Sequence, residues 1–320
     1  LETKRIPKER IDLGILGITN PQPGSFYGLP WLTGLLGLES VPGPTVQQAC
    51  ATSARALQMA AAEVAQGSAG CALIVCADRM SNGPVVYYPD ATAPGGRGIT
   101  ESWTLDNFGH EPYAGNATTA TAEDASARLG VTMAELNEVT LARFAQYQAA
   151  LADDRAFQRR YMVEAPLFDS GFRRQTGTLA ADEGIFPTTA EGLAKLKPVK
   201  PNRTHTVRTQ THPADGHAGR IGPTRELARA LSVDAVKSHN PFAANDIAFA
   251  RDTGFPLEKM NNYGCSLIWG HPQGPTGLRS TIELIEELVL RGFGVGLFTG
   301  CAAGDSGMAL VLRVREAARK

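Results

Sequence analysis

The stretch VQQACATSARALQMAAAEVAQGSAGCALIVCA, residues 46–77, decides the fold class of this chain. Val46–Gln66 is rich in alanine and carries apolar residues at helical spacing, and Gly67 is a typical helix stop. Cys71–Ala77 is a short apolar run with β-branched residues, which is typical of a buried strand. A helix that leads into a buried strand predicts one unit of a parallel α/β sheet.

The C-terminal part of the chain repeats this pattern. Ser280–Arg291 predicts an amphipathic helix that ends at the glycines of Gly292–Gly296. Gly296–Thr299 and Met308–Val314 predict strands on either side of the glycine-rich turn Cys301–Gly307. The sequence therefore predicts an α/β fold with two β/α halves of similar character.

The residues between the two halves have a different composition. Proline, glycine, asparagine and threonine dominate the first part of this region. Met133–Leu151 predicts one of two or three polar helices that follow. We expect an inserted loop domain over the core, where substrate contacts are common. The predicted domains are residues 1–86 for the N-terminal half, 87–213 for the inserted loop and substrate domain, and 214–320 for the C-terminal half.

Charge and composition exclude several classes of function. The formal net charge of −1 leaves no electrostatic footprint for nucleic acid or for an anionic membrane. The sequence has no apolar run long enough to cross a bilayer and no signal-peptide core at its start, so we expect a cytoplasmic protein, with an organelle matrix as the alternative. The five cysteines are an odd number and show no zinc-ligand spacing, so we expect free thiols and no metal site.

Cys50 is the first candidate for chemistry. It lies where a proline- and glycine-rich approach runs into the predicted helix. Helix starts stabilise a thiolate through the helix dipole and free backbone N–H groups, which predicts a reactive cysteine. The alternative is a small buried residue that packs the helix, and for an isolated free cysteine this is the commoner situation.

His271 and Cys301 are the other candidates, because each lies in a turn rich in small residues. Glycine and proline fix the backbone around His271 in WGHPQGPTG, so this histidine suits a base or an oxyanion donor, although it could equally cap the helix that follows. Cys301 opens CAAGDSG, where small residues let a ligand approach the backbone, although a turn cysteine at a strand end would look the same.

Five stretches then carry a resemblance to a known family. In chain order they are QQACATSARAL with ADRMSNGP (Ala77–Pro84), DEGIFPTTAEGLAKLKP (Asp182–Pro198), HNPF (His239–Phe242), NNYGCSLIWGHPQGPTGLR (Asn261–Arg279) and FTGCAAGDSGMALVL (Phe298–Leu312). They resemble the nucleophile segment, the loop-domain segment, the NEAF or HDCF segment, the GHP segment and the C-terminal CxG segment of thiolases. The stretches cover most of the chain, and they have the family's order. The resemblance implies a thiolase-like fold, with two stacked β/α halves, mixed sheets around buried helices and an inserted loop domain.

The resemblance implies a role for each matching residue. Cys50 corresponds to the acylated nucleophile, His271 to the histidine that activates it and helps to form an oxyanion hole, and Cys301 to the acid/base that moves the α-proton. His239 corresponds to the residue that holds the first oxyanion through a water, in the His form found in sterol-carrier-protein-linked thiolases. Thr211, in THPADG, lies near the segment that covers the pantetheine of CoA, by a looser match.

The chain also departs from the family. The strand and RTP-type segment that thiolases carry ahead of the position of Leu1 have no counterpart, and neither do a strand and helices between Arg225 and His239. We therefore expect either a shortened homologue or a sequence from which residues are omitted. Ala303 takes the place of the glycine of the CxG motif, and the backbone N–H groups of Ala303 and Cys50 are the expected oxyanion donors.

The resemblance implies an acyltransferase that cleaves 3-ketoacyl-CoA with CoA, or runs the reverse Claisen condensation, through a Cys50 acyl-enzyme. It implies CoA thioesters as substrates, no permanently bound cofactor, a role in lipid metabolism such as β-oxidation, and a homodimer or tetramer. The alternatives are a condensing or retro-aldol enzyme of the same fold, which the pair His239 and His271 favours, and a non-catalytic acyl-CoA-binding or scaffold homologue. Cys301 favours the thiolase reaction over both.

Overall fold

The two predicted β/α halves are both present in the computed structural model, which describes residues 6–169, 171, 173–222, 233–302 and 306–316. The first sheet has the strand order β2-β1-β3-β8, with bounds β1 (Leu13–Gly17), β2 (Thr45–Val46), β3 (Ala72–Arg79) and β8 (Asp215–Gly222). Its helices and short 3₁₀ turns are η2 (Lys8–Arg10), η3 (Ser25–Tyr27), α1 (Leu29–Leu35), η4 (Ala49–Ala51) and α2 (Thr52–Gln66).

The second half contains the sheet β11-β10-β9, with bounds β9 (Ala235–His239), β10 (Gly294–Cys301) and β11 (Gly307–Val314). Its helices are α8 (Ala243–Thr253), η7 (Leu257–Lys259), α9 (Ser266–Trp269) and α10 (Gly274–Leu290). Met260 pairs in a parallel bridge with Val236 of β9, in the same way that the short strand β2 pairs with β1. In both halves two parallel strands are followed by an antiparallel edge strand, so the halves share one topology.

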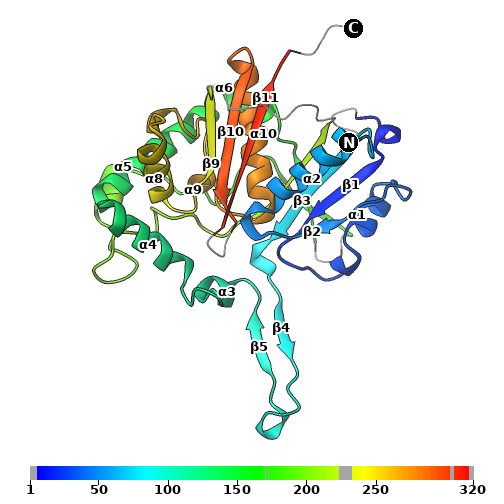
Figure 1. Cartoon of the computed structure of the whole chain (residues 1–320), viewed down its shortest axis with the longest axis horizontal. Coiled ribbons are helices and arrows are strands. Elements are labelled where there is room, and N and C mark those ends of the chain that lie inside the picture. The colour runs from blue at the N-terminus through cyan, green and yellow to red at the C-terminus, as the bar shows by residue number, and fades with distance from the viewer. Residues whose placement is uncertain (1–5, 170, 172, 223–232, 303–305, 317–320) are drawn as a thin grey trace.

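The helices α2 and α10 occupy equivalent places, α2 leading into β3 and α10 into β10, and they pack between the two sheets (Figure 1). Their contact is close because small residues face each other: a Cβ on Gly277 would lie 3.1 Å from the Phe298 ring and 3.3 Å from Ser53 Oγ. The buried side chains of Leu57, Ile74 and Leu278 join α2, the first sheet and α10 in one apolar core. The starts of both helices are thereby brought together.

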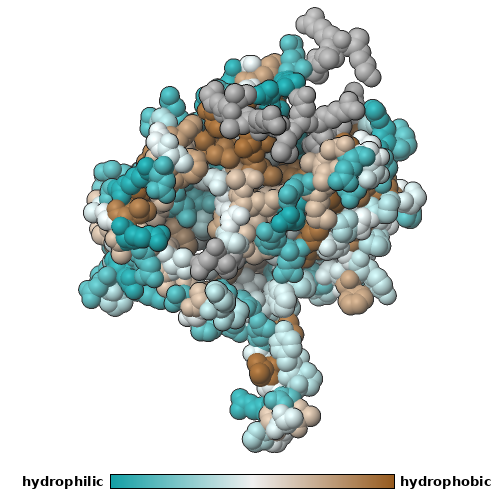
Figure 2. Space-filling model, viewed as in Figure 1, coloured by the Kyte–Doolittle hydropathy of each residue, from teal (hydrophilic) through white to brown (hydrophobic). Residues whose placement is uncertain are grey.

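The inserted region forms a lobe and an arm beside this core. Its elements are η5 (Met80–Asn82), β4 (Val85–Tyr88), η6 (Pro94–Gly96), β5 (Ile99–Ser102), α3 (Leu105–Gly109), α4 (Thr118–Leu129), α5 (Met133–Ala150), α6 (Ala152–Arg159), β6 (Ala165–Phe168), β7 (Gln175–Leu179) and α7 (Ala190–Ala194). The hairpin β4–β5 extends away from the body of the molecule (Figure 1). Apolar side chains on this arm, Val85 and Ile99 among them, are exposed (Figure 2).

Most predicted elements are confirmed, with shifted boundaries. The predicted helix 46–66 begins only at Thr52, because Thr45 and Val46 pair with β1, but it ends as predicted at Gly67, which adopts the left-handed conformation. The predicted strands at 71–77, 296–299 and 308–314 correspond to β3, β10 and β11, and the predicted helix 133–151 to α5. The strand β8 pairs with β3, so the chain returns to the first sheet after the expected boundary at 214. No helix in the described ranges is long and apolar enough to cross a membrane.

Candidate active site

Cys50 lies where the two halves meet. It occupies the 3₁₀ turn η4, which runs directly into α2, and its side chain is buried, with 6% exposed. The turn is held by the hydroxyl of Thr52, which donates to the carbonyl of Ala49 and accepts from the N–H of Gln48. The predicted place of Cys50, beside a helix start at a junction of the halves, is confirmed.

His271 approaches Cys50 from the equivalent place in the second half. It lies between α9 and α10, after Gly270 with φ +90°, and its backbone N–H donates to the carbonyl of His212. Its Nε2 lies 3.1 Å from Cys50 Sγ, and its Nδ1 lies 2.7 Å from the hydroxyl oxygen of Thr276. Burial, together with the neighbouring His239, lowers the pKa of His271 well below its ordinary value, so the ring is neutral at physiological pH.

His239 ends β9 and stacks on His271, with ring centroids 4.2 Å apart. Its Nδ1 lies 2.9 Å from Ser266 Oγ, and the Ser266 hydroxyl itself donates to the side-chain carbonyl of Asn240. This chain of hydrogen bonds assigns the proton of His239 to Nδ1 and leaves Nε2 as an acceptor. Within the described residues, Nε2 of His239 is buried without a hydrogen-bond partner.

Cys301 ends β10 and lies against Cys50, although 251 residues separate them in the sequence. A hydrogen bond with Cys301 is the largest influence on Cys50, and with burial it raises the pKa of the Cys50 thiol well above its ordinary value. The backbone hydrogen bond at the helix start favours the Cys50 thiolate as expected, but in the resting site Cys301 and burial outweigh it. The thiol is neutral at rest, because it is buried, hydrogen-bonded to Cys301 and beside a neutral His271, so a base must remove its proton.

Two further residues were predicted for the site, Ala303 and Thr211. Ala303, the expected backbone donor, lies outside the described residues. Thr211 lies beside the site, where its hydroxyl donates to the Ser266 carbonyl at 2.5 Å and its N–H donates to the Pro241 carbonyl. These bonds hold the segments of His239 and Ser266 together, so the hydroxyl proton of Thr211 is engaged within the protein.

The site also gathers possible metal ligands, which the sequence spacing did not indicate. Ligating atoms of Cys50, His239 and His271 lie within 4.8 Å of one another. Thiolate and imidazole ligands of this kind suit a zinc ion. The same atoms form the contact between Cys50 and His271, so a metal and the proton transfer would compete for them.

Two residues of the site were missed from the sequence. Gln273, in the turn before α10, has its side-chain oxygen 3.5 Å from Cys50 Sγ. Asp78, at the end of β3, accepts hydrogen bonds at 2.8 Å from the N–H groups of Thr19, Asn20 and Gly274. Gly274 is the first residue of α10, so Asp78 ties this helix start to the first sheet. The only sequence signal for either residue is its place within a stretch that carries a family motif.

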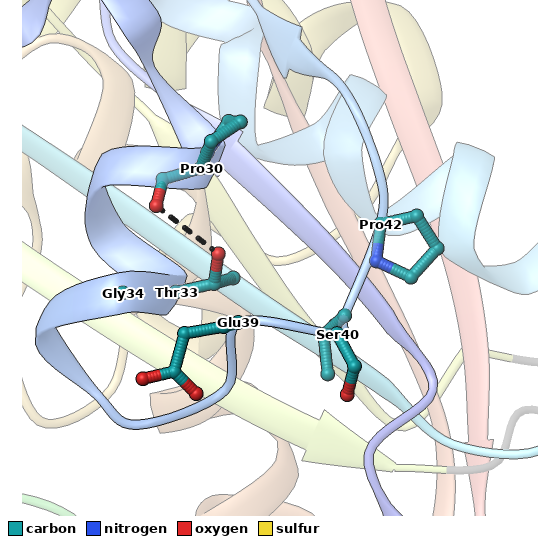
Figure 3. A pocket seen from close by; sticks show the side chains of 7 residues that line it. Pro30, Thr33, Gly34, Glu39, Ser40 and Pro42 are labelled. Atoms are coloured by element: carbon teal, nitrogen blue, oxygen red, sulfur yellow. Dashed lines mark hydrogen bonds between the residues drawn. The ribbon is translucent and has the colours of Figure 1, made fainter.

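A separate hollow lies on the surface of the first half. It has a volume of about 270 Å³ and is lined by α1 and the segment that follows it, with Pro30, Thr33, Glu39 and Ser40 among its residues (Figure 3). Its lining includes none of the candidate site residues.

Comparison with known proteins identifies the family. The family described as "Thiolase, N-terminal domain" matches residues 29–219, and "Thiolase, C-terminal domain" matches residues 224–314. The mouse protein "3-ketoacyl-CoA thiolase A, peroxisomal" is 25% identical, over 97% of this chain and 82% of its own length. "Acetyl-CoA acetyltransferase" of Chromobacterium violaceum is 26% identical, over 85% of this chain and 80% of its own length. The solved structure of human mitochondrial 3-ketoacyl-CoA thiolase in complex with CoA has the same fold, with a TM-score of 0.86 and 22% identity over 98% of this chain and 89% of that chain.

Proposed function

The chain belongs to the thiolase family, and we propose that it is an acyltransferase that moves an acyl group between CoA thioesters through a thioester on Cys50. The observation that carries this proposal is the contact of Cys50 Sγ with His271 Nε2 at 3.1 Å, with Cys301 hydrogen-bonded to the Cys50 thiol. A nucleophile, a base and a second thiol at one point are the groups that carbon–carbon bond chemistry beside a thioester requires.

The first step uses Cys50 and His271. Nε2 of His271 takes the proton of Cys50, and the sulfur attacks the ketone carbonyl of a 3-ketoacyl-CoA. For this role Nε2 must carry a lone pair, so the Nδ1–H of His271 donates to the Thr276 hydroxyl. The imidazolium that forms is costly in this buried place, which keeps the transfer reversible.

The second step breaks the bond between the α- and β-carbons. The acyl group stays on Cys50, and the departing acetyl-CoA enolate takes a proton from Cys301. An incoming CoA thiol then gives its proton to the Cys301 thiolate and attacks the Cys50 thioester. Cys50 leaves as a thiolate and recovers its proton from His271, so the site returns to its starting state. The condensation reaction is this sequence in reverse.

Both steps build negative charge on a carbonyl oxygen. Nε2 of His239 is a free acceptor within the described site, so it can hold a water whose other O–H group points at the first oxyanion. The backbone N–H groups of Cys50 and Ala303 are the proposed donors to the thioester oxyanion. Removal of one such donor typically costs about 3–4 kcal/mol of transition-state stabilisation.

A condensing enzyme with the same fold is the second candidate. The stacked pair His239 and His271 beside Cys50 favours it, because a Cys–His–His site also activates a thioester for condensation. The hydrogen bond between Cys301 and Cys50 favours the thiolase reaction, since it places a second thiol where it can move the α-proton.

Assembly and compartment remain proposals. We expect a homodimer or a tetramer, because the β4–β5 arm exposes apolar side chains that a second copy can cover. We expect no permanently bound cofactor and no nucleic-acid or membrane partner. The proposed compartment is the cytoplasm, with an organelle matrix as the alternative because the mouse relative is named peroxisomal. Light scattering would measure the assembly, and a monomer would contradict this expectation.

Acetyl transfer tests the proposed function. Incubation with acetyl-CoA should add one acetyl group to Cys50, detected by mass spectrometry of the intact protein and its peptides. Cys50→Ser should lose thiolysis almost entirely, because a hydroxyl is far less ionised than a thiol. Cys71→Ala, a half-buried cysteine outside the site, is the matched control and should behave as the wild type. Wild-type protein that takes no acetyl group would contradict the proposal.

A further inference from the structure

Gln273 occupies a strained and fully enclosed place beside Cys50. Its backbone has φ +54° and ψ −107°, a conformation that a residue with a side chain rarely adopts, and only 3% of the residue is exposed. The strain is held in place from both sides. Pro272 precedes it, and the N–H of Gly274 is bound by the carboxylate of Asp78.

The side chain of Gln273 contributes a second unfavourable feature. Its Nε2 is buried and has no hydrogen-bond partner among the residues that the structure describes, while its Oε1 lies 3.5 Å from Cys50 Sγ. A buried donor without a partner destabilises a fold, and an apolar residue of similar size would remove this cost. A residue that is unfavourable in both backbone and side chain indicates selection for function.

Building on the proposed function, we propose that the Gln273 carboxamide is a catalytic group that acts on the Cys50 sulfur and on the carbonyl attached to it. In the resting site Oε1 accepts the thiol proton of Cys50 as an alternative to His271. Once Cys50 bears an acyl group, Nε2–H donates to the thioester oxygen. That oxygen is two bonds from Sγ, and both polar atoms of the carboxamide share one carbon, so a short rotation brings the donor to the oxygen.

This role complements that of His239. Nε2 of His239 is an acceptor, because its Nδ1 carries the proton, so it can engage an oxyanion only through a water. Gln273 instead supplies a side-chain N–H directly. Direct donors aimed at a developing oxyanion are among the largest contributions to acyl-transfer rates.

Two substitutions separate this role from a structural one. Gln273→Leu keeps the approximate volume and removes both polar atoms. If Gln273 only fills the turn, this variant should unfold at the wild-type temperature or above and acetylate at the wild-type rate. If Gln273 is a donor, the unfolding temperature of Gln273→Leu should again not fall, but acetylation of its Cys50 by acetyl-CoA should slow by about tenfold to a thousandfold. Gln66→Leu, at an exposed glutamine of α2, is the control and should change neither value.

A second measurement needs no CoA. The rate at which iodoacetamide alkylates Cys50, followed against pH, reports the thiolate directly. Gln273→Glu places a negative charge beside the sulfur, so its profile should shift to higher pH than that of the wild type. An unshifted profile, or Gln273→Leu protein that acetylates at the wild-type rate, would overturn the proposal. If wild-type protein takes no acetyl group at all, the proposed function fails, and the alkylation profile still decides whether Gln273 acts on the Cys50 sulfur.

Discussion

Substitution of Asp78 tests whether one buried carboxylate joins the two halves at the turn before α10. Its Oδ1 accepts from the N–H groups of Thr19 and Asn20, and its Oδ2 accepts from the Thr19 hydroxyl and the Gly274 N–H, each at 2.8 Å. Asp78→Asn keeps the shape and one acceptor oxygen. Its new amide NH₂ group can still donate to the Thr19 hydroxyl, but it faces the Gly274 N–H with another donor.

The expected magnitude follows from counting the donors left without a partner. Asp78→Asn leaves one buried N–H, that of Gly274, which should lower the free energy of unfolding by about 1–3 kcal/mol. Asp78→Ala leaves three buried N–H groups, and a loss of about 3 kcal/mol or more is expected. In a chain of this length one kcal/mol corresponds to roughly 1–2 °C in the unfolding temperature.

Circular dichroism on heating measures the stability. The rate of Cys50 acetylation reports whether the turn that contains Gln273 keeps its conformation. Because Gly274 follows Gln273 directly, Asp78→Asn should slow acetylation as well as lower the unfolding temperature. Asp252→Asn, at an exposed carboxylate, is the matched control. If Asp78→Asn unfolds and acetylates as the wild type does, the carboxylate does not hold the helix start, and this reasoning is refuted.

The pH dependence provides a further check on Asp78. Burial outweighs its hydrogen bonds and raises the pKa of this carboxyl above its ordinary value. The native state therefore binds a proton more readily than the unfolded chain, so the contribution of Asp78 to stability falls as pH rises from about 4 through the native pKa. Asp78→Asn should remove this part of the pH dependence.

Four further predictions concern the site and the core. Cys301→Ala should still accept an acetyl group on Cys50 but should fail to exchange the α-protons of acetyl-CoA with solvent, measured by deuterium incorporation; equal loss of both would contradict the division of labour. Because the pKa of His271 lies well below its ordinary value, acetylation rates measured from about pH 5.5 to 7.5 should show no acid limb near 6.5. By the same shift, His271 should contribute stability that is lost as pH falls from about 6.5 towards its native pKa. Leu284→Ala, at a fully buried position against Gly296, should lower the free energy of unfolding by about 2–5 kcal/mol, and a loss below 1 kcal/mol would show that the core closes over the gap.

The sequence by itself determined the features that depend on neighbouring residues. The helix that ends at Gly67, the buried strand β3 and the helix α5 follow from local spacing and from caps such as the box formed by Thr132 and Glu135. The order of the motifs identified the family, and with it Cys50, His271 and Cys301 as candidates. Each helix, strand or motif signal lies within a few neighbouring residues, and the order of the motifs is that of the chain, so both can be recognised without a fold.

Tertiary structure decided what depends on contacts across the chain. Only sheet pairing could show that Thr45 and Val46 join β1 instead of starting α2, because short segments take their conformation from their partners. Only the packed site could show that Cys50 is a neutral thiol, since its pKa depends on burial and on Cys301 from the other half. Gln273 and Asp78 act through partners 223 and 196 residues away, and local sequence carries no signal for contacts at that separation.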